Sequence, residues 1–269
     1  MIKAIFIDID GTLRDSNKNL REETIEAVKK VTEKGILVIL CSGRPKKYTE
    51  KISRECFASR YVITSSGAMI YDYEDDEVLY INEMDKEAVV KLYEIAESNN
   101  SRFLMHAGDE IVGNKVNHLD EEKNLEEDIR DFVKKNSVTQ CTIFDDDYDK
   151  MESMLKEIRN IENIKTSNMS KSLVDNKFVR GKSLYCDFVA VNTNKGNGVK
   201  KLLEILNIKK EEAVAIGDDN NDIAMFKQVG YKVAVANALD RVKEEADEVI
   251  LSNDENGVAE FLRGILEDE

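Results

Sequence analysis

The feature that most constrains the fold is a series of short apolar segments near the start of the chain, with helical patterns between them. "IKAIFID" (2–8) is apolar on both faces, as a strand buried inside a parallel sheet should be. "ILVILC" (36–41) and "RYVITS" (60–65) predict two more strands. One helical pattern stops at Gly35, and another follows Pro45, which suits a first helical turn. This order predicts an α/β fold with a doubly wound parallel sheet and right-handed crossovers.

The alternation is interrupted in the middle of the chain. A hairpin with an acidic turn is expected over 68–82, and strand–helix alternation returns after residue 190. We therefore expect a discontinuous Rossmann-like core domain of residues 1–82 and 190–269, with an α+β domain inserted at 83–189. The elements expected in the insert are helices at 85–98, 120–135 and 148–159 and strands at 101–106, 138–144, 172–179 and 183–189.

Charge limits the classes of partner. The 269 residues include 54 acidic and 39 basic side chains, which gives a net charge of −15. Such a field repels nucleic acid and anionic membranes. We expect a small-molecule partner, no nucleic-acid or membrane partner, and a monomer or weak homodimer.

Cysteine and histidine usage narrows the chemistry further. No C-x-x-C pair occurs, so the cysteines are expected to be reduced thiols of a cytoplasmic protein. No apolar run approaches the ~18 residues of a membrane span, and the N-terminus lacks a signal-peptide layout. The two histidines, His106 and His118, disfavour a zinc site or a histidine-based triad. The cysteines are Cys41, Cys56, Cys141 and Cys186.

Chemically distinctive residues follow the expected strands of the core. In open α/β sheets, ligands bind beyond the carboxyl ends of the strands. Each group has an ordinary interpretation when it is taken alone: a loop pair, a turn with a helix cap, a surface lysine or an acidic helix start. The groups are Asp8 and Asp10; Ser42, Gly43 and Arg44; Lys195 in "NKGNG"; and Asp218, Asp219, Asn221 and Asp222 in "GDDNND".

A calcium loop is excluded for the last of these groups. Asp218, Asn220 and Asp222 alternate as in an EF-hand, but Ile223 stands where that loop needs glycine and Val229 where it needs an acid. Taken together, the groups favour another chemistry. Carboxylates with few nitrogen ligands suit Mg²⁺, and a hydroxyl, backbone N–H groups and a lysine suit phosphate oxygens. With a carboxylate as nucleophile and another as acid and base, this set predicts phosphoryl transfer.

The chain resembles the haloacid dehalogenase superfamily, and within it the Cof-type phosphatases that carry a large inserted cap of type IIB. "DIDGT" matches the first motif, D-x-D-G-T, and "SGRP" stands where the family has T/S-G-R-x. Lys195 matches the lysine motif, and "GDDNNDIAMF" matches G-D-x-x-N-D-x-x-M. The four motifs occur in the family's order and cover essentially the whole chain.

The resemblance implies a Mg²⁺ cofactor and a role for each motif residue. Asp8 is implied as nucleophile and metal ligand, and Asp10 as general acid and base whose backbone carbonyl is also a ligand. Asp218 is implied as the remaining protein ligand. Asp222 is implied to position Lys195 or a metal-bound water, and Arg44 to support the site. The implied phosphate-binding residues are Ser42, Gly43, Lys195 and Asn221.

Two positions depart from the family pattern. Ser66 stands where asparagine is common before Gly-Ala, and Gly198 stands in the lysine motif where a small helix former is usual. Glycine at this helical position is expected to cost up to ~1 kcal/mol of helix propensity.

The insert offers weaker indications. Arg180, Lys182 and His106 are candidates to face a substrate, although solvated surface positions are the simpler interpretation. Tyr185 and Phe188 are expected to pack, and "EEKNLEED" (121–128) is expected to form a solvated helix face. Small sugar phosphates are the substrates that the resemblance favours, ahead of cofactor phosphates such as FMN or pyridoxal phosphate.

Three other functions stay open at this stage. One is phosphoryl transfer to a sugar, as in related mutases. Another is a non-catalytic module that accepts a phosphoryl group on Asp8 and binds a partner, although Asp10 would hasten loss of that group. The last is an inactive binding protein, although every catalytic position is filled.

Overall fold

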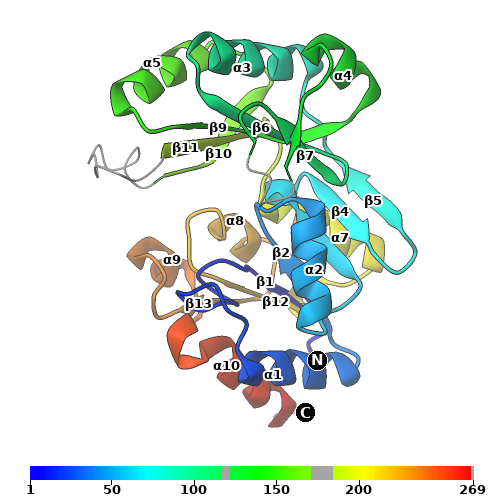
Figure 1. Cartoon of the computed structure of the whole chain (residues 1–269). Helices are drawn as coiled ribbons and strands as arrows, with labels where there is room; N and C mark the ends of the chain where they lie inside the picture. Colours follow the sequence, from blue (N-terminus) through cyan, green and yellow to red (C-terminus); the bar gives the residue numbers. More distant parts are fainter. Residues whose placement is uncertain (117–121, 171–183, 268–269) are drawn as a thin grey trace. The chain divides into compact units, whose positions relative to one another are not determined.

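The computed structural model describes residues 1–116, 122–170 and 184–267. The chain divides into two compact units: Met1–Tyr80 with Asn194–Glu269, and Ile81–Thr193. The sequence placed these joins at 82/83 and 189/190. Figure 1 shows both ends of the chain, blue and orange to red, contributing strands to the same sheet. None of the helices in the described ranges combines the length and apolar character that a bilayer crossing requires.

The described strands of the first unit form one eight-stranded sheet, in the order β14-β13-β12-β1-β2-β3-β4-β5. From β14 to β3 all neighbouring strands are parallel, and β4 is antiparallel to β3. The expected hairpin is present, because β4 and β5 are neighbours in the sheet and are joined by a turn at residues 73–76. The strand bounds are β1 Ala4–Ile7, β2 Leu37–Cys41, β3 Tyr61–Thr64, β4 Met69–Asp72, β5 Glu77–Ile81, β12 Ala213–Gly217, β13 Tyr231–Val235 and β14 Glu248–Ile250.

Strand β1 lies at the centre of this sheet and fixes where the site forms. All its residues are completely buried, which agrees with its lack of alternation. Its last residue, Ile7, pairs with Leu40 of β2 on one side and with Ile216 of β12 on the other. The loops that follow these three strands therefore leave the sheet at the same edge.

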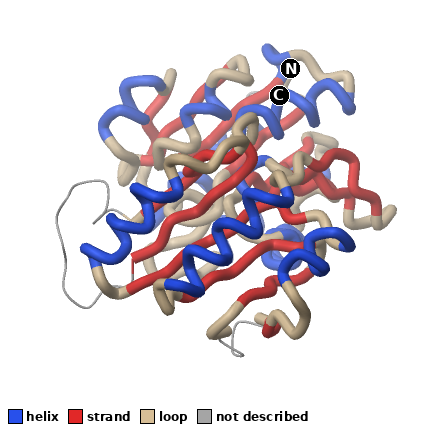
Figure 2. Tube along the Cα trace, turned by 90° about the horizontal axis from the view of Figure 1, so that it is seen from above, coloured by secondary structure: helices blue, strands red, loops and turns tan. Residues whose placement is uncertain are grey.

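Helices cover both faces of the first sheet, which confirms the doubly wound fold. Helices α1 and α10 pack together below the sheet in Figure 1, and α8 lies above it. Figure 2 shows helices flanking strands throughout the chain. The helical bounds are α1 Glu22–Glu33, α2 Lys46–Glu55, α7 Lys195–Leu206, α8 Ile223–Phe226, α9 Asp240–Glu245 and α10 Gly257–Glu267, with short 3₁₀ turns η1 Ser65–Gly67, η3 Lys210–Glu212 and η4 Asn253–Glu255.

The second unit has its own sheet, of order β10-β11-β9-β6-β7-β8, and its own hydrophobic core. Helices α3, α4 and α5 cover one face of it (Figure 1). Each begins with an aspartate whose carboxylate accepts a hydrogen bond from a first-turn N–H, which favours a helix start. The bounds are α3 Lys86–Ser98, β6 Arg102–Ala107, β7 Glu110–Gly113, β8 Lys123–Asn124, α4 Ile129–Lys135, β9 Val138–Asp145, α5 Tyr148–Ile158, β10 Ile164–Met169 and β11 Leu184–Ala190.

The expected helix over 120–135 is wrong in its first half. Lys123–Asn124 form β8, and the helix begins only at Ile129, after the Asp128 cap. Glu122 is buried and forms an ion pair with Arg102, so "EEKNLEED" is not a solvated helix face. The sequence also missed β7 and β10, and the strand expected at 172–179 lies outside the described residues.

Helix α7 comes unusually close to the sheet at its first turn, and this explains Gly198. A Cβ on Gly198 would lie 2.7 Å from Ile63 Cγ2 and 3.2 Å from Gly67 Cα. A Cβ on Gly196 would lie 2.1 Å from the Ala224 carbonyl oxygen. Glycine at these positions lets the helix approach β3, η1 and α8. Gly198 therefore has the helix-propensity cost expected from the sequence, but it also allows α7 to pack closely against its neighbours.

Replacing Gly198 by alanine should lower stability, although alanine is the better helix former. The collision with buried Ile63 should cost about 1–3 kcal/mol, which outweighs a propensity gain of up to about 1 kcal/mol. Gly264→Ala is the matched control, because no heavy atom lies within 4 Å of its added Cβ in α10. Urea unfolding should show the control unchanged or more stable. A stabilised Gly198→Ala protein would contradict the packing argument.

Candidate active site

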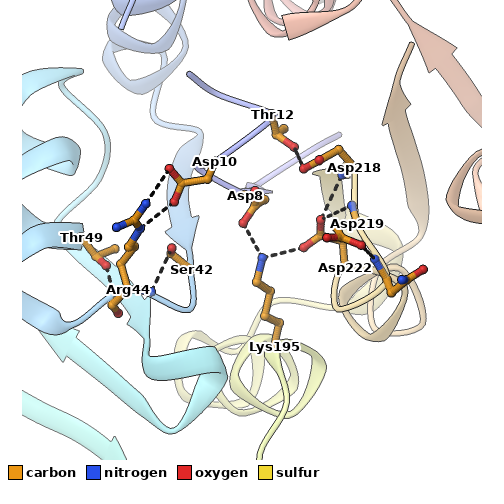
Figure 3. A network of polar contacts seen from close by, with 11 residues as sticks. Asp8, Asp10, Thr12, Ser42, Arg44, Thr49, Lys195, Asp218, Asp219 and Asp222 are labelled. Carbon is orange, nitrogen blue, oxygen red and sulfur yellow. Dashed lines mark hydrogen bonds and ion pairs between the residues drawn. The ribbon is translucent and has the colours of Figure 1, made fainter. Parts of the chain in front are cut away.

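The site lies in the first unit, where the sequence placed it. Asp8 follows β1, Ser42 follows β2 and Asp218 follows β12, so the three loops meet at the carboxyl edge of the sheet. Lys195, the first residue of α7, approaches the same edge (Figure 3). Residues from both ends of the chain therefore share one site.

Lys195 is the centre of this arrangement. It is 2% exposed, and its Nζ donates hydrogen bonds to Asp8 Oδ1 and, at 2.6 Å, to Asp222 Oδ1. Asp8 and Asp222 are buried as well. A buried ammonium requires such partners, because an unpaired charge in this environment is very costly.

Asp222 uses both carboxylate oxygens within the protein. While Oδ1 accepts from Lys195, Oδ2 accepts from the backbone N–H groups of Asp218 and Asp219, each at 3.0 Å. Asp222 thus fixes the lysine and the loop after β12 relative to each other. This geometry matches an anchoring function and leaves Asp8 and Asp218 as the carboxylates with oxygens to spare.

Asp218 is held from the other side by the loop after β1. Thr12 Oγ1 donates to Asp218 Oδ1 at 2.8 Å. Gly11 has a φ of +94°, and a Cβ there would lie 2.5 Å from Asp218 Oδ2. Glycine is needed at this place both for the backbone conformation and for the close approach of the carboxylate. The sequence motif contained Thr12, but we assigned no contact to it.

The site has an excess of negative charge. Oxygens of Asp8, Asp218 and Asp222 lie within 4.8 Å of one another, with Lys195 as their cation. Burial, reinforced by Asp222, raises the pKa of Asp218 to about 7. Burial also raises the pKa of Asp8 above its usual range, against the opposing effect of Lys195. For Lys195, burial favours the neutral form, but Asp222 and Asp8 outweigh it and raise its pKa.

Asp10 points away from this cluster and pairs with Arg44. The guanidinium donates from Nε to Asp10 Oδ2 at 2.8 Å and from Nη2 to Oδ1 at 3.2 Å (Figure 3). Arg14 Nη1 lies 3.9 Å from the same carboxylate and donates to the Tyr48 hydroxyl. From the sequence, Arg44 was expected only to support the site, and neither Arg14 nor Tyr48 was predicted to belong to it.

The loop after β2 is fixed through its backbone. Ser42 Oγ accepts from the Arg44 N–H at 3.2 Å, and the Ser42 carbonyl accepts from the Ser66 N–H. A Cβ on Gly43 would lie 3.3 Å from Ser66 Oγ. Ser66 has a left-handed backbone, with φ 59° and ψ 26°. Asparagine tolerates that region better than serine, which gives a physical reason for the asparagine that is common there.

The remaining candidates are less closely connected. Asn221 Oδ1 is buried and has no hydrogen-bond partner within the described ranges. In the second unit His106 is 8% exposed, so the surface interpretation of this residue is wrong. Phe188 packs in the core as expected, and Tyr185 lies 6.4 Å from Phe144 between ring centroids. The other candidates of the insert, Arg180 and Lys182, lie outside the described residues.

The four cysteines are free and buried. Burial raises the pKa of Cys41 and Cys141 above the ordinary thiol range, and that of Cys56 and Cys186 to about 12. Thiolate chemistry is therefore disfavoured at these positions.

A family model of haloacid dehalogenase-like hydrolases matches residues 5–262. The chain belongs to this family, and its Cof-type assignment is confirmed.

Relatives across the whole length are phosphatases. A phosphoglycolate phosphatase of Archaeoglobus fulgidus is 30% identical over 263 residues, covering 97% of this chain and 96% of its own. The 5-amino-6-(5-phospho-D-ribitylamino)uracil phosphatase YwtE of Bacillus subtilis is 25% identical over 296 residues, covering 98% of each. The protein is a phosphatase of the haloacid dehalogenase type.

The fold agrees with that of a solved relative. A haloacid dehalogenase-like hydrolase from Bacteroides thetaiotaomicron superposes with a TM-score of 0.83 at 30% identity, covering 98% of this chain and 100% of the other. This comparison confirms the Rossmann-like core with its inserted α+β cap domain.

Asp222→Asn should destabilise the first unit strongly. The change weakens the buried pairing with Lys195, and losing one partner of such a pair costs about 3–5 kcal/mol. Asp219→Asn is the matched control, because Asp219 is only half-buried and its Oδ1 accepts a single bond from the Asn220 N–H. Urea unfolding followed by circular dichroism measures both. Equal stability of the two variants would show that Asp222 is not the anchor described above.

Proposed function

We propose that the protein is a Mg²⁺-dependent phosphomonoester hydrolase that acts on small phosphorylated metabolites through an aspartyl-phosphate on Asp8. The observation that carries this proposal is the contact between Asp8 and buried Lys195 beside Asp218. It presents a carboxylate at the end of the central strand, next to a fixed positive charge and a second acid. This is the equipment for phosphoryl transfer.

The residues at the site fit a divalent cation. Three carboxylates face one lysine, and the pKa of Asp218 is raised to about 7, so a cation would relieve an existing excess of negative charge. We assign the metal to Asp8 and Asp218 and, from the family motif, to the backbone carbonyl of Asp10. Asp222 is assigned to anchoring Lys195 and the loop after β12, because its Oδ1 accepts from Lys195 and its Oδ2 accepts from two backbone N–H groups. Mg²⁺, when bound, supplies charge stabilisation to the transferring group.

The chain's own residues divide the reaction between them. Asp8 attacks phosphorus, and the bond to the leaving oxygen breaks as that oxygen takes a proton from Asp10. Asp10 then takes a proton from the water that cleaves the aspartyl-phosphate, which returns Asp8 to a carboxylate and releases phosphate. Lys195 holds Asp8 and offers charge to the phosphoryl oxygens. Ser42, Gly43 and Asn221 are assigned to the same oxygens.

Asp10 and Asp8 lie in different environments. The Asp10 carboxylate is partly exposed and accepts two hydrogen bonds from Arg44, whereas Asp8 is buried. Two acids placed two residues apart thus have different environments, which suits separate roles as nucleophile and proton carrier.

Small phosphate esters are the proposed substrates. Relatives are named for phosphoglycolate and for a phosphorylated ribitylaminouracil, and sugar phosphates remain the class that we expected from the sequence. The inserted unit, residues 83–189 by the sequence boundaries, is proposed to act as the cap that excludes water and selects the substrate.

Asp8→Asn should abolish phosphate release from p-nitrophenyl phosphate. The substitution keeps the shape of the side chain and removes the nucleophile and one negative charge. The wild type should be active with Mg²⁺ and inactive with EDTA, and added Mg²⁺ should restore its activity. Asp149→Asn, which makes the same change at an exposed residue of α5, should retain wild-type activity.

Two results would refute the mechanism. If Asp8→Asn kept wild-type activity, Asp8 would not be the nucleophile. If the wild type kept full activity in EDTA, the reaction would not require a metal. Release of inorganic phosphate without an added acceptor distinguishes hydrolysis from transfer to a sugar. A phosphorylated protein that persists for hours instead of turning over would favour the phospho-acceptor module.

A further inference from the structure

A group of basic and aromatic side chains lies beside the general acid. Tyr48 of α2 contacts two guanidinium groups: Arg44 Cζ lies 4.8 Å and Arg14 Cζ 6.0 Å from the centre of its ring. Arg14 also donates from Nη1 to the Tyr48 hydroxyl. Cation–π contact and the hydrogen bond hold both guanidinium groups next to Asp10. We call Arg14 and Arg44 the arginine pair.

The two arginines are used differently. Arg44 makes a bidentate pair with Asp10. Both polar contacts of the Arg14 guanidinium within the described part of the chain are made through Nη1, one to Tyr48 and one at 3.9 Å to Asp10. A guanidinium carries five N–H donors, so Nε and Nη2 of Arg14 have donors left for a ligand. Its side chain is 16% exposed, which partly shields it from water.

The local charge contrasts with its surroundings. Two arginines face one carboxylate here, whereas three carboxylates face one lysine at the neighbouring cluster, and the chain as a whole carries −15. An anion that approaches the site is attracted to the arginine pair.

We propose that Arg14, with Arg44, recognises a carboxylate on the alcohol half of the substrate, close to the ester oxygen. This inference rests on the proposed function, in which Asp10 protonates the leaving oxygen. That oxygen must come within about 2.6–3.2 Å of the Asp10 carboxylate. Arg14 Nη1 is 3.9 Å from the same carboxylate, which puts the Arg14 guanidinium beside the position proposed for the leaving oxygen and near a group attached to it. The preferred substrates are therefore phosphate esters of short hydroxy acids.

The experiment compares two esters that differ in a single charge: the phosphate ester of glycolic acid and that of glycolamide. They have nearly the same shape, and only the first carries a carboxylate. The wild type with Mg²⁺ should prefer the acid ester in kcat/KM by on the order of tenfold or more, as expected for a charge-assisted hydrogen bond. Arg14→Met should remove most of this preference.

Two further variants separate recognition from positioning. Arg14→Lys keeps the charge and should retain part of the preference. Arg263→Met removes an exposed arginine from α10 and should leave the preference as in the wild type. If Arg14→Met lowers kcat/KM equally for both esters, Arg14 only positions Asp10 and the inference is overturned.

Failure of the inference and failure of the proposed function give different results. If the glycolamide ester is hydrolysed and the acid ester is not preferred, phosphatase activity stands and carboxylate recognition is wrong. If neither ester nor p-nitrophenyl phosphate is hydrolysed with Mg²⁺, the proposed function fails and the inference fails with it.

Discussion

The buried contact of Lys195 with Asp8 and Asp222 is the interaction on which the rest of the site depends. It joins the end of β1, the start of α7 and the loop after β12 at a single nitrogen. Desolvation of these groups is repaid only while all three are in place, because a buried ion that loses its partner is strongly destabilising. The geometry of the site is therefore tied to the stability of the unit that contains it.

Reaching that contact requires α7 to begin unusually close to the sheet. Glycines at 67, 196 and 198 remove the side chains that would collide with neighbouring backbone or with Ile63. A second set of contacts, Thr12 to Asp218 and Arg44 to Asp10, then orients the two remaining acids. The glycines thus let α7 approach the sheet, and the hydrogen bonds orient the acids of the site.

The core could be predicted from the sequence because its signals are local and strong. Buried strands read as apolar runs, and the carboxyl ends of parallel strands must meet, so Asp8 and Asp218 were expected together. The helix prediction for segment 121–128 was wrong because polar residues with no clear period do not distinguish a helix from a strand. Arg14 and Tyr48 could not be paired in advance, because their contact depends on how α2 approaches the loop after β1. From the sequence, Gly198 was expected only to weaken its helix, because its neighbours Ile63 and Gly67 are distant in sequence.

The discontinuous core also has a consequence for the order of events during synthesis. Asp8 and Lys195 are separated by 187 residues, and Thr12 and Asp218 by 206. On the ribosome, β1 can pair with β2 early, but the edge that it offers to β12 stays unsatisfied until most of the chain has emerged. The second unit, with its own sheet and core, has every internal contact available before then. The candidate site is thus completed late in synthesis, and a chain released before residue 218 lacks Asp218 and Asp222.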